Sequence, residues 1–384
     1  MRSEQEGTTA PLCAERRLLY FCSAPLLEST ACFTHVNEIV RGLGDLGWNV
    51  NLLAPPARSR RGALRRVVDS LVMQAKAVRR LNEVDVVYCR FHFLLWPIAM
   101  WLSMRGVPVV QEVNGPYEDV FVAWPAAQHV RALITAAMRM QLKRADTVIT
   151  VTEQLRDWVE REAPQTYAVT IPNGANVDVF RPEAIATFEF SEPYVIFFGS
   201  LARWQGIETL LQAAEEPGWP DGVRLVVVGD GTCRPTVERA AANSRVCYLG
   251  PRTQSEVAGL VARSFASVIP KNSLGERNST GLAALKLYES MAASVPVIVT
   301  DLPGHAELVR LNRCGIVVPV GDAPAIATAV SELWRSKAAS QAMGSRGRQF
   351  VLREASWACR AAETDKALTG LTQSVRGHVK ELPA

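Results

Sequence analysis

The stretch TGLAALKLYESMAASVPVIVT, residues 280–300, has the pattern of a helix followed by a strand. Thr280 or Ser279 is a suitable N-cap, because a hydroxyl there accepts an otherwise unpaired backbone N–H. Apolar residues recur at intervals of three and four, which predicts a helix with one apolar face as far as about Ala293. The segment VPVIVT that follows has the β-branched composition of a buried strand.

The predicted helix carries Lys286 and Glu289, three residues apart and away from its apolar face. A helix N-terminus presents free N–H groups and a partial positive charge, which suit a phosphate. Glu289 lies roughly eight residues further in, about 12 Å along the axis at ~1.5 Å per residue. That is about the span from a diphosphate to a ribose, so the stretch is compatible with a nucleoside diphosphate. Spacing alone leaves open a second interpretation, a buried helix with a surface Lys–Glu pair.

The rest of the chain alternates strands and helices. RRLLYFCSAP (16–25), the helical segment HVNEIVRGLGDLG and the strand NVNLLAPP form a first β–loop–α–β unit. Repeated alternation of this kind favours an α/β fold with parallel sheets. No G-x-G-x-x-G follows the first strand, and 384 residues favour two domains.

Composition excludes several classes of protein. A formal net charge of +4 does not indicate a nucleic-acid partner, and 48% hydrophobic residues argue against disorder. Eight scattered cysteines without C-x-x-C or metal-ligand spacing predict reduced thiols in a cytoplasmic protein and no metal site. The longest apolar run, residues 93–104, is shorter than the ~20 residues that span a bilayer, so we expect no transmembrane segment.

Residues 58–80 are strongly basic, with eight Arg or Lys and one acid, Asp69. The segment also has an apolar stripe, formed by Leu64, Val67, Val68, Leu71, Val72 and Ala75. A basic amphipathic helix of this kind can lie on an anionic membrane surface. The open alternative is an ordinary helix whose arginines are solvated.

Four segments resemble the glycosyltransferase family 4 enzymes, which have the GT-B fold. They are EVNGP (112–116), AVTIPNGANVDVFRP (168–182), LKLYESMAASVPVIVTD (285–301) and GIVVPVGD (315–322). The resemblance covers residues 16–360. It implies two Rossmann-like domains whose parallel sheets face a central cleft, with a C-terminal helix crossing back to the first domain. The implied divisions are an acceptor-binding domain 1–182, a nucleotide-sugar-binding domain 183–360 and the returning helix 361–384.

The resemblance also implies roles for individual residues. Arg203 and Lys286 would stabilise the departing diphosphate, and Glu289 would hold the ribose. Further implied donor-side residues are Gly199, Ser200, Gln205, Gly229, Asp230, Arg252, Thr280, Gly281, Leu282 and Ala283. Implied acceptor-side residues are Ser29, Thr30, His35, Asn114 and Asn173.

Two positions depart from the family pattern. Gln205 stands where a lysine of a K-G pair is usual, so Lys286 or Arg277 is the candidate second cation. Gly281 occupies the first position of the E-x7-E pattern that ends at Glu289, where a glutamate normally touches the transferred sugar. Glycine there allows close backbone approach, so main-chain N–H groups or other side chains must recognise the sugar.

The resemblance implies a retaining glycosyltransferase that uses a nucleoside-diphosphate sugar, with no metal or other cofactor. A saccharide or lipid-linked acceptor at the inner membrane face, in cell-surface polysaccharide or glycoconjugate synthesis, fits the basic helix. A sugar-nucleotide epimerase or hydrolase is an alternative, with Glu112, Glu118 and His92 as the only placeable acid/base groups. A non-catalytic scaffold is another alternative, supported by Gln205 and Gly281.

Overall fold

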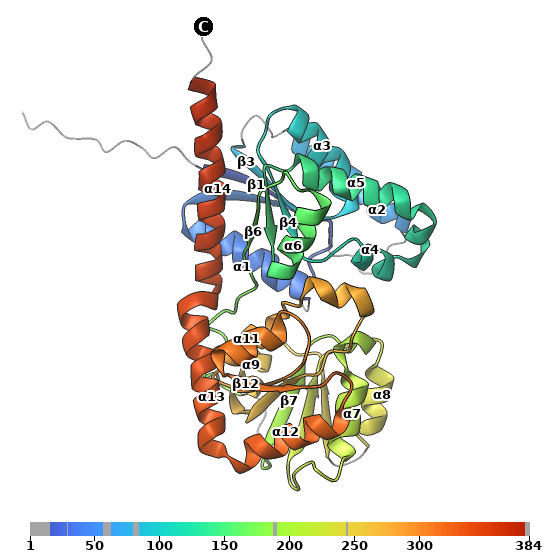
Figure 1. Cartoon of the computed structure of the whole chain (residues 1–384), viewed down its shortest axis with the longest axis vertical. Coiled ribbons are helices and arrows are strands. Elements are labelled where there is room, and N and C mark those ends of the chain that lie inside the picture. The colour runs from blue at the N-terminus through green and yellow to red at the C-terminus, as the bar shows by residue number, and fades with distance from the viewer. Residues whose placement is uncertain are drawn as a thin grey trace, which may run out of the picture.

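The computed structural model describes residues 16–28, 30–56, 63–79, 84–186, 190–242 and 245–380. The chain forms two α/β domains stacked one above the other, and each contains a six-stranded parallel sheet (Figure 1). The predicted α/β class with two Rossmann-like domains is therefore confirmed. The described residues do not include Ser29, residues 58–62 and 80 of the basic segment, or residues 187–189 of the interdomain stretch.

The N-terminal sheet has the strand order β2-β1-β3-β4-β5-β6. Its strands are β1 (Arg16–Phe21), β2 (Trp48–Leu53), β3 (Val86–Arg90), β4 (Val109–Val113), β5 (Thr147–Thr150) and β6 (Ala168–Thr170). The helices between them are α1 (Ala31–Asp45), α2 (Ala63–Val78), α3 (Trp96–Met104), α4 (Glu118–Ala123), α5 (Arg131–Arg144) and α6 (Glu153–Glu162), with 3₁₀ turns η2 (Phe93–Leu95) and η3 (Pro125–Val130). Strands β4 and β5 are buried throughout, as expected for a parallel sheet covered on both faces.

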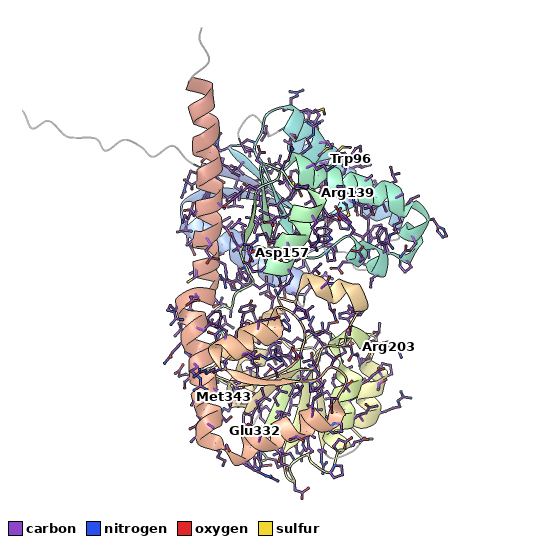
Figure 2. All side chains as sticks on the ribbon, in the orientation of Figure 1. Trp96, Arg139, Asp157, Arg203, Glu332 and Met343 are labelled. Atoms are coloured by element: carbon purple, nitrogen blue, oxygen red, sulfur yellow. The ribbon has the colours of Figure 1, made fainter. Side chains whose placement is uncertain are left out.

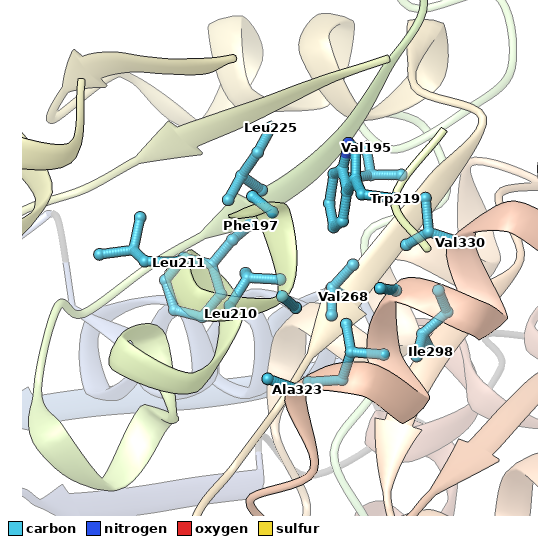
Figure 3. Packing of buried hydrophobic residues seen from close by; sticks show 14 of the residues in the cluster. Val195, Phe197, Leu210, Leu211, Trp219, Leu225, Val268, Ile298, Ala323 and Val330 are labelled. Atoms are coloured by element: carbon cyan, nitrogen blue, oxygen red, sulfur yellow. The ribbon is translucent and has the colours of Figure 1, made fainter. Parts of the chain in front are cut away.

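The C-terminal sheet has the strand order β12-β11-β10-β7-β8-β9. Its strands are β7 (Tyr194–Phe198), β8 (Arg224–Val228), β9 (Val246–Gly250), β10 (Ala266–Ile269), β11 (Val297–Thr300) and β12 (Gly315–Val318). Its helices are α7 (Ile207–Glu215), α8 (Arg234–Ala240), α9 (Gln254–Arg263), α10 (Leu285–Ala292), α11 (His305–Asn312), α12 (Ala323–Arg335) and α13 (Lys337–Phe350), with 3₁₀ turns η4 (Arg203–Gln205) and η5 (Gly275–Thr280). On one face of this sheet, side chains from β7, β8 and β10 pack against α7 and α12 (Figure 3).

Strand order reverses within the C-terminal sheet. The chain leaves β7 toward β8 and β9, then resumes on the other side of β7 with β10, β11 and β12. The carboxyl ends of β7 and β10 therefore flank a topological switch point, the place where open α/β sheets bind ligands. The segments that leave these two strand ends are 199–206 and 270–284, so most of the predicted donor-side residues lie there.

The C-terminal helix α14 (Trp357–Lys380) follows a π-helical turn η6 (Val351–Ala355) and returns to the N-terminal domain (Figure 1). The Asp365 carboxylate accepts hydrogen bonds from the Arg16 guanidinium at 2.6 Å and from the Trp48 indole N–H at 2.7 Å. Trp357 and Leu368 belong to the same buried cluster as strands β1 and β3. The helix thus completes the core of the domain in which the chain began.

Two predicted helix starts are wrong. Helix α1 begins at Ala31, earlier than His35, because the Thr30 hydroxyl accepts the Phe33 N–H at 3.2 Å and caps it. Helix α10 begins at Leu285, later than predicted, and neither Ser279 nor Thr280 caps it. Gly281 has φ 72° and ψ 169°, a conformation that interrupts a helix. Glu289 is therefore four residues into α10, about 6 Å along its axis.

Helix α2 exposes much of the apolar stripe that the sequence analysis identified in residues 58–80. Val68, Leu71 and Val72 are each about half exposed, whereas the buried residues of α2 include Ser70, Met73 and Gln74. Within the described part of the chain, none of the helices has the length and hydropathy needed to cross a bilayer.

Candidate functional site

The switch point of the C-terminal sheet brings together Gly199, Gln205 and Lys286. The Lys286 ammonium donates to Gln205 Oε1 at 3.1 Å and lies 4.2 Å from the centroid of the Phe197 ring. Gly199 has φ 112°, and a Cβ built there would lie 3.3 Å from Lys286 Nζ. The lysine therefore lies directly over the backbone turn that ends β7, and a larger residue at 199 would crowd it.

The loop after β8 packs closely on the loop after β7. A Cβ on Gly229 would lie 1.9 Å from the Gly199 carbonyl oxygen, and one on Gly231 would lie 2.6 Å from that of Leu201. Between them, the Asp230 carbonyl accepts the Leu201 N–H at 2.9 Å. These contacts require glycine at both positions and leave the side chain of Asp230 exposed at the mouth of the switch point.

Lys286 and Glu289 are both buried, so the interpretation of a surface Lys–Glu pair is wrong. Their exposed fractions are 8% and 9%. Burial, together with the nearby Lys271 ammonium, lowers the pKa of Lys286 to about 7. Burial also raises the pKa of Glu289 to about 7, although Lys286 opposes that shift. Two ionisable groups on adjacent turns are held in low dielectric, which is common at ligand sites.

The predicted donor segment 280–283 also joins the two domains. The Thr152 hydroxyl donates to the Thr280 carbonyl at 2.6 Å, and the Asn173 amide donates to the Ala283 carbonyl. A Cβ on Gly281 would lie 2.6 Å from Gln154 Oε1, so α6 covers this glycine closely. Leu282 donates its N–H to the Pro303 carbonyl at 2.9 Å. Hydrogen bonds from the N-terminal domain and within the C-terminal domain thus fix residues 280–283.

Most of the predicted acceptor-side residues form a buried network in the N-terminal domain. His35 Nδ1 lies 2.8 Å from Asn173 Oδ1, and its Nε2 lies 2.9 Å from Glu112 Oε1. Asn114 also hydrogen-bonds to Glu112. The positive groups around Glu112 hold its pKa well below the usual range. This network links the N-terminal sheet through Asn173 to Ala283, and Thr30 serves as the α1 cap.

Like Asp230, the predicted donor-side residues Arg203, Ser200 and Arg252 have exposed or partly exposed side chains. Arg203 is 81% exposed, with Nε 3.7 Å from Glu208 Oε1, and its side chain lies at the outer edge of the C-terminal domain (Figure 2). Ser200 is also exposed, and the Arg252 guanidinium donates to the Pro251 carbonyl at 3.1 Å. In this conformation the Lys286 ammonium lies at the β7 turn, whereas the exposed Arg203 guanidinium faces Glu208.

The acid/base groups suggested for an epimerase are engaged elsewhere. Glu112 accepts from the Tyr20 hydroxyl at 2.9 Å and pairs with Arg90 at 2.6 Å. Glu118 faces Arg131 at 3.3 Å. Burial lowers the pKa of His92 to about 4, and its Nδ1 accepts the Leu94 N–H. These contacts do not favour epimerase chemistry.

Sequence reasoning missed two basic residues at this site. His305 Nε2 accepts the Ala284 N–H at 2.9 Å, so it closes the turn that precedes α10. Burial, with Lys271 and Lys286 nearby, lowers the pKa of His305 well below its usual value. Lys271 follows β10 and faces the same cluster. Neither stands in a motif, and only the strand order reveals that Lys271 lies beside the β7 loop. Among the described residues, no cluster of His, Cys, Asp and Glu is suited to a metal ion.

Sequence comparisons divide the chain at the same place as the structure. Residues 33–179 match the family model described as Glycosyltransferase Family 4, and residues 192–336 match the one described as Glycosyl transferases group 1. A GDP-mannose-dependent alpha-(1-6)-phosphatidylinositol monomannoside mannosyltransferase of Mycobacterium tuberculosis is 28% identical over 212 residues, covering 52% of this chain and 55% of the relative. The match therefore spans about half the length of that relative. A phosphatidyl-myo-inositol mannosyltransferase of Mycobacterium leprae is 28% identical over 299 residues, covering 76% of each chain.

Solved structures share the whole architecture. A sucrose-phosphate synthase from Thermosynechococcus elongatus superposes with a TM-score of 0.77 at 19% identity, covering 94% of this chain and 100% of that one. Anabaena HepE in complex with UDP superposes with a TM-score of 0.67 at 15% identity, covering 93% and 100%. Two stacked parallel-sheet domains with a returning C-terminal helix, together with these matches, define a GT-B glycosyltransferase. The chain belongs to glycosyltransferase family 4.

Proposed function

We propose that this protein transfers a sugar from a nucleoside-diphosphate sugar to a hydroxyl of a saccharide or lipid-linked acceptor, with retention of anomeric configuration. The pathway we infer is cell-surface polysaccharide or glycoconjugate synthesis. The observation that carries the proposal is the buried pair Lys286 and Glu289 on successive turns of α10, beside the β7 turn. A lysine there can neutralise a diphosphate, and a carboxylate further along the helix can accept ribose hydroxyls.

The names of relatives support the donor class. One curated relative is named as GDP-mannose-dependent, and HepE structures were solved with UDP and with UDP-glucose. The mannosyltransferase names also refer to phosphatidylinositol acceptors, which are lipids. These names describe those proteins, and we extend to this chain only the nucleoside-diphosphate donor and a lipid-linked or saccharide acceptor.

The proposed reaction needs no covalent enzyme intermediate. The acceptor oxygen bonds to the anomeric carbon on the face from which the diphosphate departs, and the bond from that carbon to the phosphate oxygen breaks. The acceptor proton passes to the departing phosphate oxygen. Lys286 stabilises the charge that develops on the diphosphate, and Arg203 would join it after a side-chain movement. No metal or other cofactor enters the proposal.

We also propose that the N-terminal domain lies on an anionic membrane, at the inner face of a cytoplasmic membrane. Exposed apolar side chains gather on α2 and on the neighbouring segment from α4 to α5, which lie on the same side of this domain (Figure 1). They are Val68, Leu71, Val72, Val122, Val130 and Leu133. Arg65 and Arg66 are exposed on the same helix, and the Arg66 guanidinium lies 5.3 Å from the Trp124 ring centroid. Apolar and basic groups together are the composition of an interfacial surface.

A transfer assay tests the proposed function. The protein would be incubated with GDP-mannose, UDP-glucose or UDP-N-acetylglucosamine and with lipid-linked or oligosaccharide acceptors, and the product linkage read by NMR. An α-linked product from an α-linked donor is expected. A β-linked product would overturn retention. Donor consumption that no acceptor accelerates would favour the hydrolase or epimerase. Failure to bind any nucleoside diphosphate would favour the scaffold.

A further inference from the structure

Lys271 lies at the switch point of the C-terminal sheet, where the chain leaves β10. One hydrogen bond to its carbonyl and two from the next residue hold the segment there. The Thr300 hydroxyl donates to the Lys271 carbonyl at 2.8 Å. The next residue, Asn272, donates its N–H to the Trp204 carbonyl at 3.1 Å and its side-chain amide to the Arg203 carbonyl at 2.9 Å. The segment after β10 is therefore attached to the loop after β7.

Gly206, in the loop after β7, also approaches the start of the segment after β10 closely. Gly206 has φ 73°, and a Cβ there would lie 1.6 Å from the Pro270 carbonyl oxygen. The loop after β7 and the loop after β10 therefore pack directly against each other. Lys271 lies on the β10 side of this contact, and Lys286 lies over the β7 turn.

The charges around Lys271 do not balance. Lys286, Arg277 and His305 are the basic groups of this cluster, and Asp119 and Glu289 are its carboxylates. Asp119 is already engaged with Arg277. Among the described residues, neither Lys271 nor Lys286 has a carboxylate at salt-bridge distance. Lys286 is buried and Lys271 is partly buried. Charges withdrawn from water in proteins are normally paired, so two lysines without a carboxylate indicate that an anion belongs between them.

We propose that Lys271 binds the diphosphate of the donor together with Lys286, so that the two lysines form the cation pair of this site. The inference rests on the proposed function and adds to it a residue outside the family pattern. A nucleoside diphosphate at the switch point would receive one ammonium group from the end of β10 and one from α10. Neither depends on a movement of the exposed Arg203 side chain.

The proposal predicts that protons are taken up when the ligand binds. Burial, with Arg277 nearby, lowers the pKa of Lys271 to about 8, and that of Lys286 is lowered to about 7. Both amines are therefore partly uncharged at pH 8. A bound anion favours the charged forms, so a diphosphate should bring roughly one proton with it. Glu289, whose pKa is raised to about 7, is largely ionised at pH 8 and contributes little to this change.

The experiment is calorimetric titration of the full chain at pH 8 with UDP and GDP, in HEPES and in Tris. These buffers differ in ionisation enthalpy, so the difference in observed heat counts the protons. Wild type should take up about one proton. Lys271→Met should weaken binding of the diphosphate about tenfold or more and reduce the uptake. Binding of uridine or guanosine, which lack phosphate, should not change.

Two further variants keep the test decisive. Lys271→Arg retains a permanent charge, so it should keep most of the affinity but take up fewer protons. Lys337→Met removes an exposed lysine from α13, in the same domain but outside this site, and should change neither quantity. Equal affinity and equal uptake in wild type and Lys271→Met would overturn the role of Lys271 and leave the proposed function standing. No binding of either diphosphate by wild type would overturn both.

Discussion

Arg277 and Asp119 form a two-point ion pair across the two domains, with Nε to Oδ1 at 2.8 Å and Nη2 to Oδ2 at 3.0 Å. Arg277 was a candidate phosphate ligand from sequence, but in this structure its guanidinium is committed to the N-terminal domain. The same side chain donates to Thr280 Oγ1 at 3.2 Å and to the Gly281 carbonyl at 3.3 Å. It therefore couples the donor segment to the arrangement of the domains.

Breaking this pair should loosen the contact between the two domains. In Arg277→Ala, conformations with the domains further apart should become more populated, and the radius of gyration from small-angle X-ray scattering should increase. We expect a change of about 1 kcal/mol, because Asp119 is partly solvated. The exchanged pair Arg277→Asp with Asp119→Arg should recover part of the compactness. Identical scattering from wild type and Arg277→Ala would show that the pair does not hold the two domains together.

Glu289→Ala should weaken nucleoside diphosphate binding. A carboxylate that accepts ribose hydroxyls contributes about 1.5–3 kcal/mol. That corresponds to roughly ten- to a hundredfold in affinity, measured by calorimetry. Because the pKa of Glu289 is raised to about 7, its contribution should diminish as pH falls below that value. Glu332→Ala, which removes an exposed glutamate on α12 (Figure 2), is the matched control. Unchanged affinity in Glu289→Ala would remove the residue from the ribose site.

Lys286→Met should make the ligand-free protein more stable. The pKa of Lys286 falls from 10.5 to about 7 on folding, so its charge opposes folding most strongly at and below pH 7. Wild type should gain stability relative to the variant as pH rises from 7 through 10.5, because the lysine is neutral in both states only above that range. Thermal unfolding should thus show a higher Tm for Lys286→Met at pH 7 and a smaller difference at pH 10. A lower Tm for Lys286→Met than for wild type at pH 7 would show that the buried ammonium does not destabilise the ligand-free protein.

Two glycines of α1 should respond oppositely to alanine. A Cβ on Gly42 would lie 2.5 Å from the Ala361 Cβ of α14, whereas nothing lies within 4 Å of one on Gly44. Gly44→Ala should stabilise the protein by up to ~1 kcal/mol through helix propensity. Gly42→Ala should destabilise it, because α14 must move away. Chemical denaturation measures both, and stabilisation by Gly42→Ala would show that the α1–α14 contact is looser than the structure indicates.

The proposed membrane surface should depend on both charge and apolar area. Each basic residue near an anionic leaflet contributes about 1 kcal/mol. Replacement of Arg65 and Arg66 by glutamate should therefore release the protein from phosphatidylserine vesicles in a sedimentation assay. Replacement of Leu71 and Val72 by serine should also release the protein from these vesicles, and at all salt concentrations, because salt does not screen apolar contacts. The control is Arg239→Glu with Arg335→Glu, an exposed pair in the other domain. If wild type stays in the supernatant at low salt, the surface does not bind membranes.

Much of the fold could be predicted because it depends on local patterns. The segment VPVIVT predicted a buried strand, and β11 occupies Val297–Thr300 within it, since a central parallel strand must be apolar on both faces. The start of α10 could not be predicted in the same way. Thr280 looks like an N-cap, but its hydroxyl bonds with Arg277, and the backbone of Gly281 prevents the helix from beginning there.

The site was harder to predict because it depends on residues far apart in sequence. Lys286 and Glu289 were found through their motif. The chain of contacts from His35 through Asn173 to Ala283 joins three distant segments and leaves no local pattern. Lys271 was missed for the same reason, since its place beside Trp204 follows from strand order and not from spacing along the chain.

The path of α14 affects how the protein is made. Trp357 and Leu368 fill the core beside Leu18 and Tyr20, so the N-terminal domain leaves the ribosome before the C-terminal domain but is completed after it. Residues 190–356 must emerge, and can fold, before that core is closed. During synthesis, part of the apolar surface of the N-terminal sheet therefore stays exposed until α14 has been made. A nascent chain arrested before residue 357 would present that surface to chaperones.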